Sequence, residues 1–98
     1  MDRDNVILKL RQHETELRAA GIMSLSLFGS VARGDANEQS DVDLMADFDR
    51  AKKLSLLGAV GLANKLTDIL GVKADLSQRE TLKPDVLKRA TREAVVVF

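Results

Sequence analysis

Nine residues in the middle of the chain, 41–49, alternate between apolar and acidic side chains with a period of two. Val, Leu, Ala and Phe occupy the even positions, and Asp occupies every odd position except one, which is Met45. A period of two is typical of a β-strand with one buried and one polar face, and a helix cannot satisfy it. The rest of the fold must therefore cover one face of this strand and leave a row of carboxylates on the other.

The flanking segments carry patterns that predict the cover for this strand. We predict further strands at 22–28 and 72–77, helices at about 4–20 and about 54–70, a helical turn at 30–33 and a helix from Pro84 to about residue 92. The apolar run 94–98 suits a buried strand or an interface. In a chain of 98 residues these elements predict one domain, residues 1–98, with helices on one face of a sheet and the other face open.

The composition excludes several kinds of site. Without Cys the chain has no disulfide, no thiol nucleophile and no Cys-ligated zinc, and the single histidine, His13, fits the edge of the core. Because 15 Lys and Arg balance 15 Asp and Glu, and only three residues are aromatic, we expect no direct nucleic-acid binding. No apolar run approaches the roughly 20 residues of a membrane span, and the first residues do not form a signal peptide, so we expect a cytoplasmic protein without membrane contact.

The candidate site starts from Asp41 and Asp43, which are separated by one residue on the predicted strand. Their carboxylates therefore leave the same face, with Cα atoms roughly 6.5–7 Å apart, and repel each other. A Mg²⁺ ion would relieve this repulsion, since it binds one or two carboxylates together with phosphate oxygens. The alternative interpretation of the same pair is a solvated edge strand that carries acids for solubility.

Gly29 and Ser30 follow the first predicted strand, where a short helix begins. A glycine lets the backbone approach a ligand, and the helix start with the Ser30 hydroxyl offers hydrogen-bond donors to a phosphate. Asp75, on the polar side of a later strand, can supply a third carboxylate. A P-loop is excluded because Asp35 and Ala36 replace its Lys and Ser or Thr, and an EF-hand loop lacks its Gly and its terminal acid.

The run LFGSVARGDANEQSDVDL at residues 27–44 closely resembles the signature of minimal nucleotidyltransferases, in the polymerase-beta-like nucleotidyltransferase superfamily. The family pattern is a Gly-Ser pair, ten residues, an Asp-x-Asp and a third Asp on a later strand. The matching positions are Gly29, Ser30, Asp41, Asp43 and Asp75. Pro84, Leu87 and Arg92, together with the run 93–98, also look like the end of this family, so the resemblance covers nearly the whole chain.

The resemblance implies an α+β fold with a small mixed sheet, and a metal-dependent transfer of a nucleoside monophosphate to a hydroxyl with release of pyrophosphate. Asp41 and Asp43 would hold two Mg²⁺ ions, and Asp75 would complete one metal site and accept the acceptor's proton. Gly29, Ser30 and nearby backbone N–H groups would bind the triphosphate of ATP. Arg33 would either reach a phosphate or act as a surface ion-pair partner.

The resemblance also implies a partner, because this chain carries only the catalytic core and the acceptor must come on its own folded surface. Proteins of this kind resemble the antitoxin half of toxin–antitoxin pairs, which transfers AMP to a tyrosine of a helical HEPN-type RNase toxin. Two alternatives stay open. One is a catalytically silent module that neutralises its partner by occlusion, and the other is a homodimeric transferase that acts on a small molecule.

Overall fold

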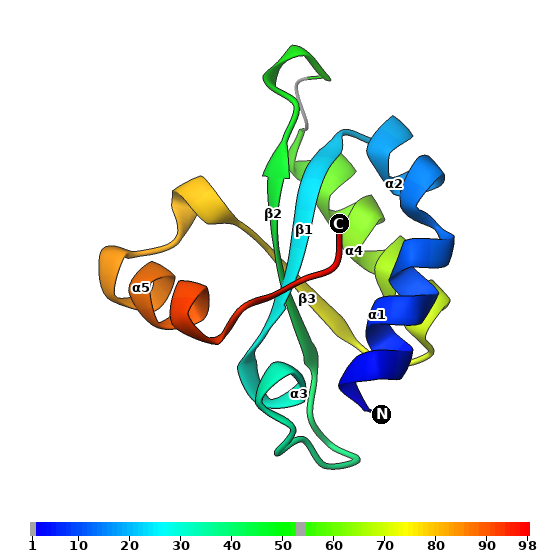
Figure 1. The fold of residues 1–98 in the computed structure, drawn as a ribbon. Helices are drawn as coiled ribbons and strands as arrows, with labels where there is room; N and C mark the ends of the chain where they lie inside the picture. Colours follow the sequence, from blue (N-terminus) through cyan, green and yellow to red (C-terminus); the bar gives the residue numbers. More distant parts are fainter. Residues whose placement is uncertain (1, 53–54) are drawn as a thin grey trace.

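The computed structural model describes residues 2–52 and 55–98, and its centre is a four-stranded sheet (Figure 1). The elements in chain order are α1 (Arg3–Gln12), α2 (Glu14–Ala19), β1 (Ile22–Phe28), α3 (Gly29–Arg33), β2 (Val42–Phe48), η1 (Arg50–Lys52), α4 (Leu56–Leu70), β3 (Ala74–Gln78), η2 (Arg79–Thr81), α5 (Pro84–Glu93) and β4 (Val95–Val96). The predicted strands are present with small shifts at their ends. Of the helix predicted at about 54–70, residue 54 lies outside the described residues.

The sheet is mixed, with the strand order β3-β2-β1-β4. Strand β1 runs antiparallel to both β2 and β4, while β2 and β3 run parallel. In this register Asp43 of β2 lies opposite Phe28, the last residue of β1, and opposite Asp75 of β3. The sheet topology therefore brings the end of β1 and two acidic residues of neighbouring strands to one place.

Three helices, α1, α2 and α4, cover one face of the sheet (Figure 1). The even-numbered residues of β2 supply the sheet side of this core, as the alternation predicts, and Leu44 is fully buried. The helices contribute Val6, Leu10, Leu17, Leu62, Leu66 and Leu70. Since full burial of such a side chain is worth roughly 1.5–3 kcal/mol, this aliphatic layer fixes which face of β2 points inward.

The N-terminal helix is interrupted, whereas the apolar spacing predicts one helix over about 4–20. His13 leaves the helical conformation, with φ −108° and ψ 14°, and separates α1 from α2. Its ring Nδ1 lies 2.9 Å from the carbonyl oxygen of Lys9, one turn earlier. The half-buried His13 is thus a boundary residue, as its position predicts, and it also marks the break in the helix.

Helix α5 lies on the opposite side of the sheet from the other long helices (Figure 1). It contacts β1 and α3, and its Ala90 is buried. Met45 belongs to the polar face of β2, yet it is 0% exposed, and its partner in β1, Ser26, is also buried. The sequence pattern alone predicts all helices on one face; in the structure α5 covers the middle of the second face and leaves its Asp43 end open.

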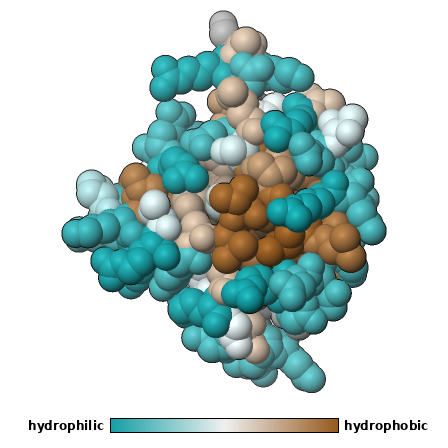
Figure 2. Space-filling model, in the orientation of Figure 1, coloured by the Kyte–Doolittle hydropathy of each residue, from teal (hydrophilic) through white to brown (hydrophobic). Residues whose placement is uncertain are grey.

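An apolar area remains on the surface beside the C-terminal strand, and Figure 2 shows it as a brown patch near the centre of the view. Ile7, Leu8, Val95 and Val96 line a shallow hollow here, flanked by charged residues of α1, and we call these four residues the α1/β4 patch. Val96 is 63% and Leu8 56% exposed, while Val97 is buried and donates to Leu25. The apolar tail is thus partly buried, at Val97, and partly surface, along the edge strand β4.

The described helices include none with the length and apolar composition that a membrane crossing requires.

Candidate active site

The tightest feature of the open end is the packing of Asp43 against Gly29. Strand β1 ends at Phe28, and Gly29 begins α3 with φ +77°, a conformation that favours glycine. A Cβ atom at position 29 would overlap Oδ2 of Asp43 and lie 3.1 Å from its Cγ. The carboxyl group of Asp43 therefore occupies the space that any other residue 29 would fill, whereas the sequence predicts Gly29 as a close-approach point for a phosphate.

Asp41 and Asp75 lie beside this carboxyl group, as predicted. Asp75 pairs with Asp43 in the parallel register, so both side chains leave the same face of neighbouring strands about 4.8 Å apart. Asp41 precedes β2 by one residue and shares the parity of Asp43. Its Oδ2 lies 3.8 Å from Nζ of Lys73, at the start of the neighbouring strand. The structure therefore brings the three predicted acids together at one end of the sheet.

The crowding of negative charge changes the acidity of Asp43. Burial raises the pKa of its carboxyl group above the ordinary value of 3.8, and the charges of Asp75 and Asp41 raise it further. Arg33 acts in the opposite direction and favours the ionised form, while Glu93 adds to the rise in pKa. Asp43 is thus an acid held among other acids, with one guanidinium opposing them.

This set of residues fits a divalent cation in its chemistry. No three acidic or histidine side chains form a ready-made cage for a metal ion within 2–52 and 55–98. Mg²⁺ does not require one, because it binds through one or two carboxylates and takes its other ligands from water and substrate phosphates. A carboxyl group whose pKa is raised by neighbouring carboxylates, as at Asp43, belongs to a donor set that a cation would stabilise.

Ser30 and Arg33 lie on α3, directly after Gly29. The Ser30 carbonyl accepts from the backbone N–H groups of Gly34 and Asp35, which closes the short helix. Nε of Arg33 lies 3.0 Å from Oδ2 of Asp35, and its Nη1 lies 3.0 Å from Oε2 of Glu93. Of the two roles predicted for Arg33, the structure shows the ion pair.

The sequence patterns did not single out two residues that lie at this end of the sheet, Lys73 and Glu93. Lys73 shares the polar side of its strand with Asp75, and its pairing with Asp41 follows from the register. Glu93 is the last residue of α5, where an acid is unfavourable for the helix dipole. That local conflict is the signal that could have marked Glu93 as a residue with a partner elsewhere.

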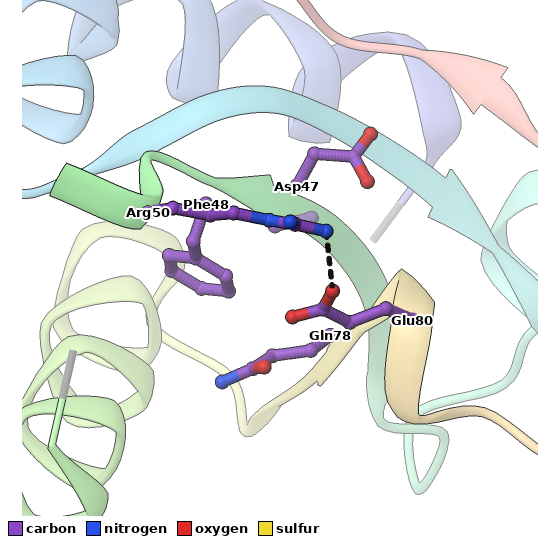
Figure 3. Close-up of a pocket in the computed structure, with 6 residues that line it drawn as sticks. Asp47, Phe48, Arg50, Gln78 and Glu80 are labelled. Atoms are coloured by element: carbon purple, nitrogen blue, oxygen red, sulfur yellow. Dashed lines mark ion pairs between the residues drawn. The ribbon is translucent and has the colours of Figure 1, made fainter. Parts of the chain in front are cut away.

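A second hollow, shown in Figure 3, lies at the far end of β2. Arg50 and Glu80 form an ion pair across it, with 3.6 Å between Nη2 and Oε2. Asp47 accepts from Ser24 Oγ at 2.7 Å and from Arg79 Nε at 3.2 Å. Asp47 is four residues from Asp43, about 13 Å along the strand, so this paired cluster is separate from the candidate site.

Known proteins are similar to this chain in both sequence and fold. The family model described as nucleotidyltransferase domain matches residues 10–97. The protein adenylyltransferase MntA of Thermococcus cleftensis is 39% identical over 89 residues, which cover 90% of this chain and 88% of that protein. A solved structure of a proposed minimal nucleotidyltransferase is 34% identical with a TM-score of 0.78, over 97% of this chain and 95% of that one.

A more distant solved structure is similar in fold alone. It contains a tri-AMPylated HEPN toxin of Shewanella oneidensis in complex with an MNT antitoxin. The matched chain is 19% identical, with a TM-score of 0.69, over 93% of this chain and 70% of that one.

The contact between Gly29 and Asp43 predicts unequal effects of two glycine substitutions. Gly34 also has a positive φ, +84°, but a Cβ there meets no atom within 4 Å. Gly34→Ala should therefore cost only the left-handed strain, about 1–2 kcal/mol. Gly29→Ala should cost roughly 1–3 kcal/mol more, because the new methyl group must displace Asp43. Chemical denaturation of both variants measures the difference, and equal losses would contradict the packing argument.

The raised pKa of Asp43 predicts how Asp43→Asn changes stability with pH. A raised pKa in the folded state means that this group's contribution is present below pH 3.8 and is lost as the pH rises through the folded value. Asp43→Asn should therefore raise the Tm at pH 7 in the presence of a chelator. The gain should shrink towards zero below about pH 4. Asp68→Asn, on the exposed side of α4, is the matched control for the loss of one carboxylate.

Proposed function

This chain belongs to the nucleotidyltransferase domain family, and we propose that it transfers AMP from ATP to a hydroxyl group of a partner protein. The observation that carries the proposal is the arrangement of Asp43. Its carboxyl group lies against Gly29 and pairs in register with Asp75, so the family's Gly-Ser and Asp-x-Asp segments meet at one point. The 39% identity to a protein adenylyltransferase supports AMP as the transferred group.

Each side chain then has a role in an in-line displacement. Asp41 and Asp43 are the proposed ligands of two Mg²⁺ ions, which when bound would neutralise phosphate charge and acidify the acceptor hydroxyl. Ser30, with the backbone N–H groups of α3, holds the triphosphate. Asp75 accepts the proton of the acceptor hydroxyl while the hydroxyl oxygen bonds to the α-phosphorus of ATP. The bond from that phosphorus to the leaving pyrophosphate breaks in the same step.

Arg33 supplies a positive charge that acts on Asp43 from within the protein. Its guanidinium already favours ionised Asp43, and it remains 44% exposed despite its two acidic partners. A guanidinium can bind two phosphate oxygens in one plane. We therefore assign Arg33 to phosphate binding in addition to its ion pairs.

For the acceptor, we propose a tyrosine of a HEPN-type toxin, with this chain as the antitoxin. The support is the shared fold with an MNT antitoxin that was solved in complex with an AMPylated HEPN toxin. The α1/β4 patch is the proposed docking surface, because Val96 and Leu8 leave apolar area uncovered beside an edge strand. An exposed apolar patch rimmed by charged residues is typical of a contact surface for another protein.

The acidic pair gives the direct test of the reaction. Replacing Asp41 and Asp43 together with Asn should lower Mg²⁺-dependent transfer of labelled AMP from ATP by roughly 100-fold or more, because the charges that hold the metal are lost. Intact mass of the partner, in steps of one AMP, measures the product. Asp68→Asn is the control and should keep full activity. Transfer that persists in the double variant would refute the assignment.

The same assay separates the alternatives. A partner that binds the wild-type chain and never gains mass would indicate an antitoxin that acts by occlusion alone. Transfer of AMP to a small molecule, with the chain found as a dimer by native mass measurement, would indicate the homodimeric transferase.

The docking surface predicts a position-specific effect of a new charge. Leu8→Glu should weaken the complex with the proposed HEPN-type toxin partner by about tenfold or more, since it buries a carboxylate in an apolar contact. Leu57→Glu is the matched control, because Leu57 is 84% exposed on α4, outside the patch. Binding isotherms at low and high salt measure both, and a wild-type affinity that collapses at moderate salt would contradict an apolar interface.

A further inference from the structure

The ion pair between Arg33 and Glu93 joins two elements that are far apart in the sequence. Arg33 ends α3 and Glu93 ends α5, 60 residues later. Nη1 of Arg33 lies 3.0 Å from Oε2 of Glu93, and the Glu93 side chain is only 21% exposed. Helices α3 and α5 contact each other, and the Arg33–Glu93 ion pair links α5 to a residue of the proposed phosphate site.

Arg33 is held from two directions at once. Nε and Nη2 of Arg33 donate to the Asp35 carboxylate, at 3.0 and 3.4 Å, and Nη1 donates to the Glu93 carboxylate. A guanidinium has five N–H donors, so these contacts use three and leave one on each terminal nitrogen. The remaining two lie in the guanidinium plane, which suits two oxygens of one phosphate.

Glu93 is unfavourable where it stands by two local criteria. An acid at the last residue of a helix opposes the helix dipole. Its charge also adds to the negative field at Asp43 and raises the pKa of that carboxyl group. A residue that breaks local rules at a functional end of the molecule is expected to supply a compensating contact, and the contact present is the one to Arg33.

We propose that Glu93 is a positioning residue that holds the Arg33 guanidinium next to the acidic cluster, ready for a phosphate of the nucleotide. The inference rests on the proposed function for the identity of the ligand. A free arginine side chain samples many rotamers and loses this conformational entropy when it binds. An arginine fixed beforehand by Asp35 and Glu93 loses less of it at the moment of binding.

A double-mutant cycle tests this role through ATP affinity, measured by equilibrium titration of the full chain with ATP in the presence of Mg²⁺. Glu93→Gln keeps the shape and removes the charge, and we expect it to weaken ATP binding about tenfold, with KM rising and kcat nearly unchanged. Arg33→Ala should weaken binding at least as much. Adding Glu93→Gln to Arg33→Ala should then weaken ATP binding no further, because the positioning role of Glu93 acts through Arg33.

Glu14→Gln is the matched control, since it removes the partner of another arginine, Arg18, 2.6 Å away on α2. It should leave ATP affinity unchanged. The proposal is overturned if Glu93→Gln lowers only the Tm, if it weakens ATP binding equally without Arg33, or if Arg33→Ala leaves ATP affinity intact. A wild-type chain that binds ATP with this coupling but transfers no AMP would contradict the proposed function and support the positioning role.

Discussion

The carboxyl group of Asp43 lies where the side chain of residue 29 would otherwise be, and the rest of the site depends on this contact. It requires a glycine with positive φ directly after β1, which turns the chain into α3. It also requires the register that pairs Phe28 with Asp43, and the separate parallel register of β2 with β3 places Asp75 alongside. This contact therefore joins the acidic end of β2 to the short helix that carries Arg33.

This arrangement concentrates negative charge at a cost to the folded state. Desolvation and neighbouring carboxylates disfavour ionised Asp43, and the positive groups nearby compensate in different ways. Lys73 pairs loosely with exposed Asp41, whereas Arg33 is fixed by two acids and acts on Asp43 itself. A cation and a triphosphate would complete the balance, because the metal offsets the carboxylates and the phosphates accept from Arg33. The charges of this site thus suit the ligands proposed for it.

Period-two patterns made the sheet predictable, since a register shift of one residue in β2 would exchange Leu44 for Asp43 in the core. The same patterns placed Asp41, Asp43 and Asp75 on one face. They could not place α5, because its apolar side fits either face of a sheet. Met45, the one apolar residue in the acidic row, was the only sign in the β2 pattern that part of the second face is buried. The helix break at His13 left no comparable trace, since apolar spacing continues across it.

The pairing of Glu93 with Arg33 and the packing of Asp43 against Gly29 are contacts between distant segments. Spacing along the chain does not encode such contacts. The motif explains why a glycine and an Asp-x-Asp occur, but only the fold shows that they touch. Glu93 also ends the helix that leads, through Ala94, into β4. Glu93, which pairs with Arg33, and Val95 and Val96 of the α1/β4 patch therefore lie in one short segment. A substitution at Val95 or Val96 would be expected to affect both the patch and the ion pair. Leu8 lies on α1, outside that segment, so a charge placed there perturbs the patch without moving Glu93.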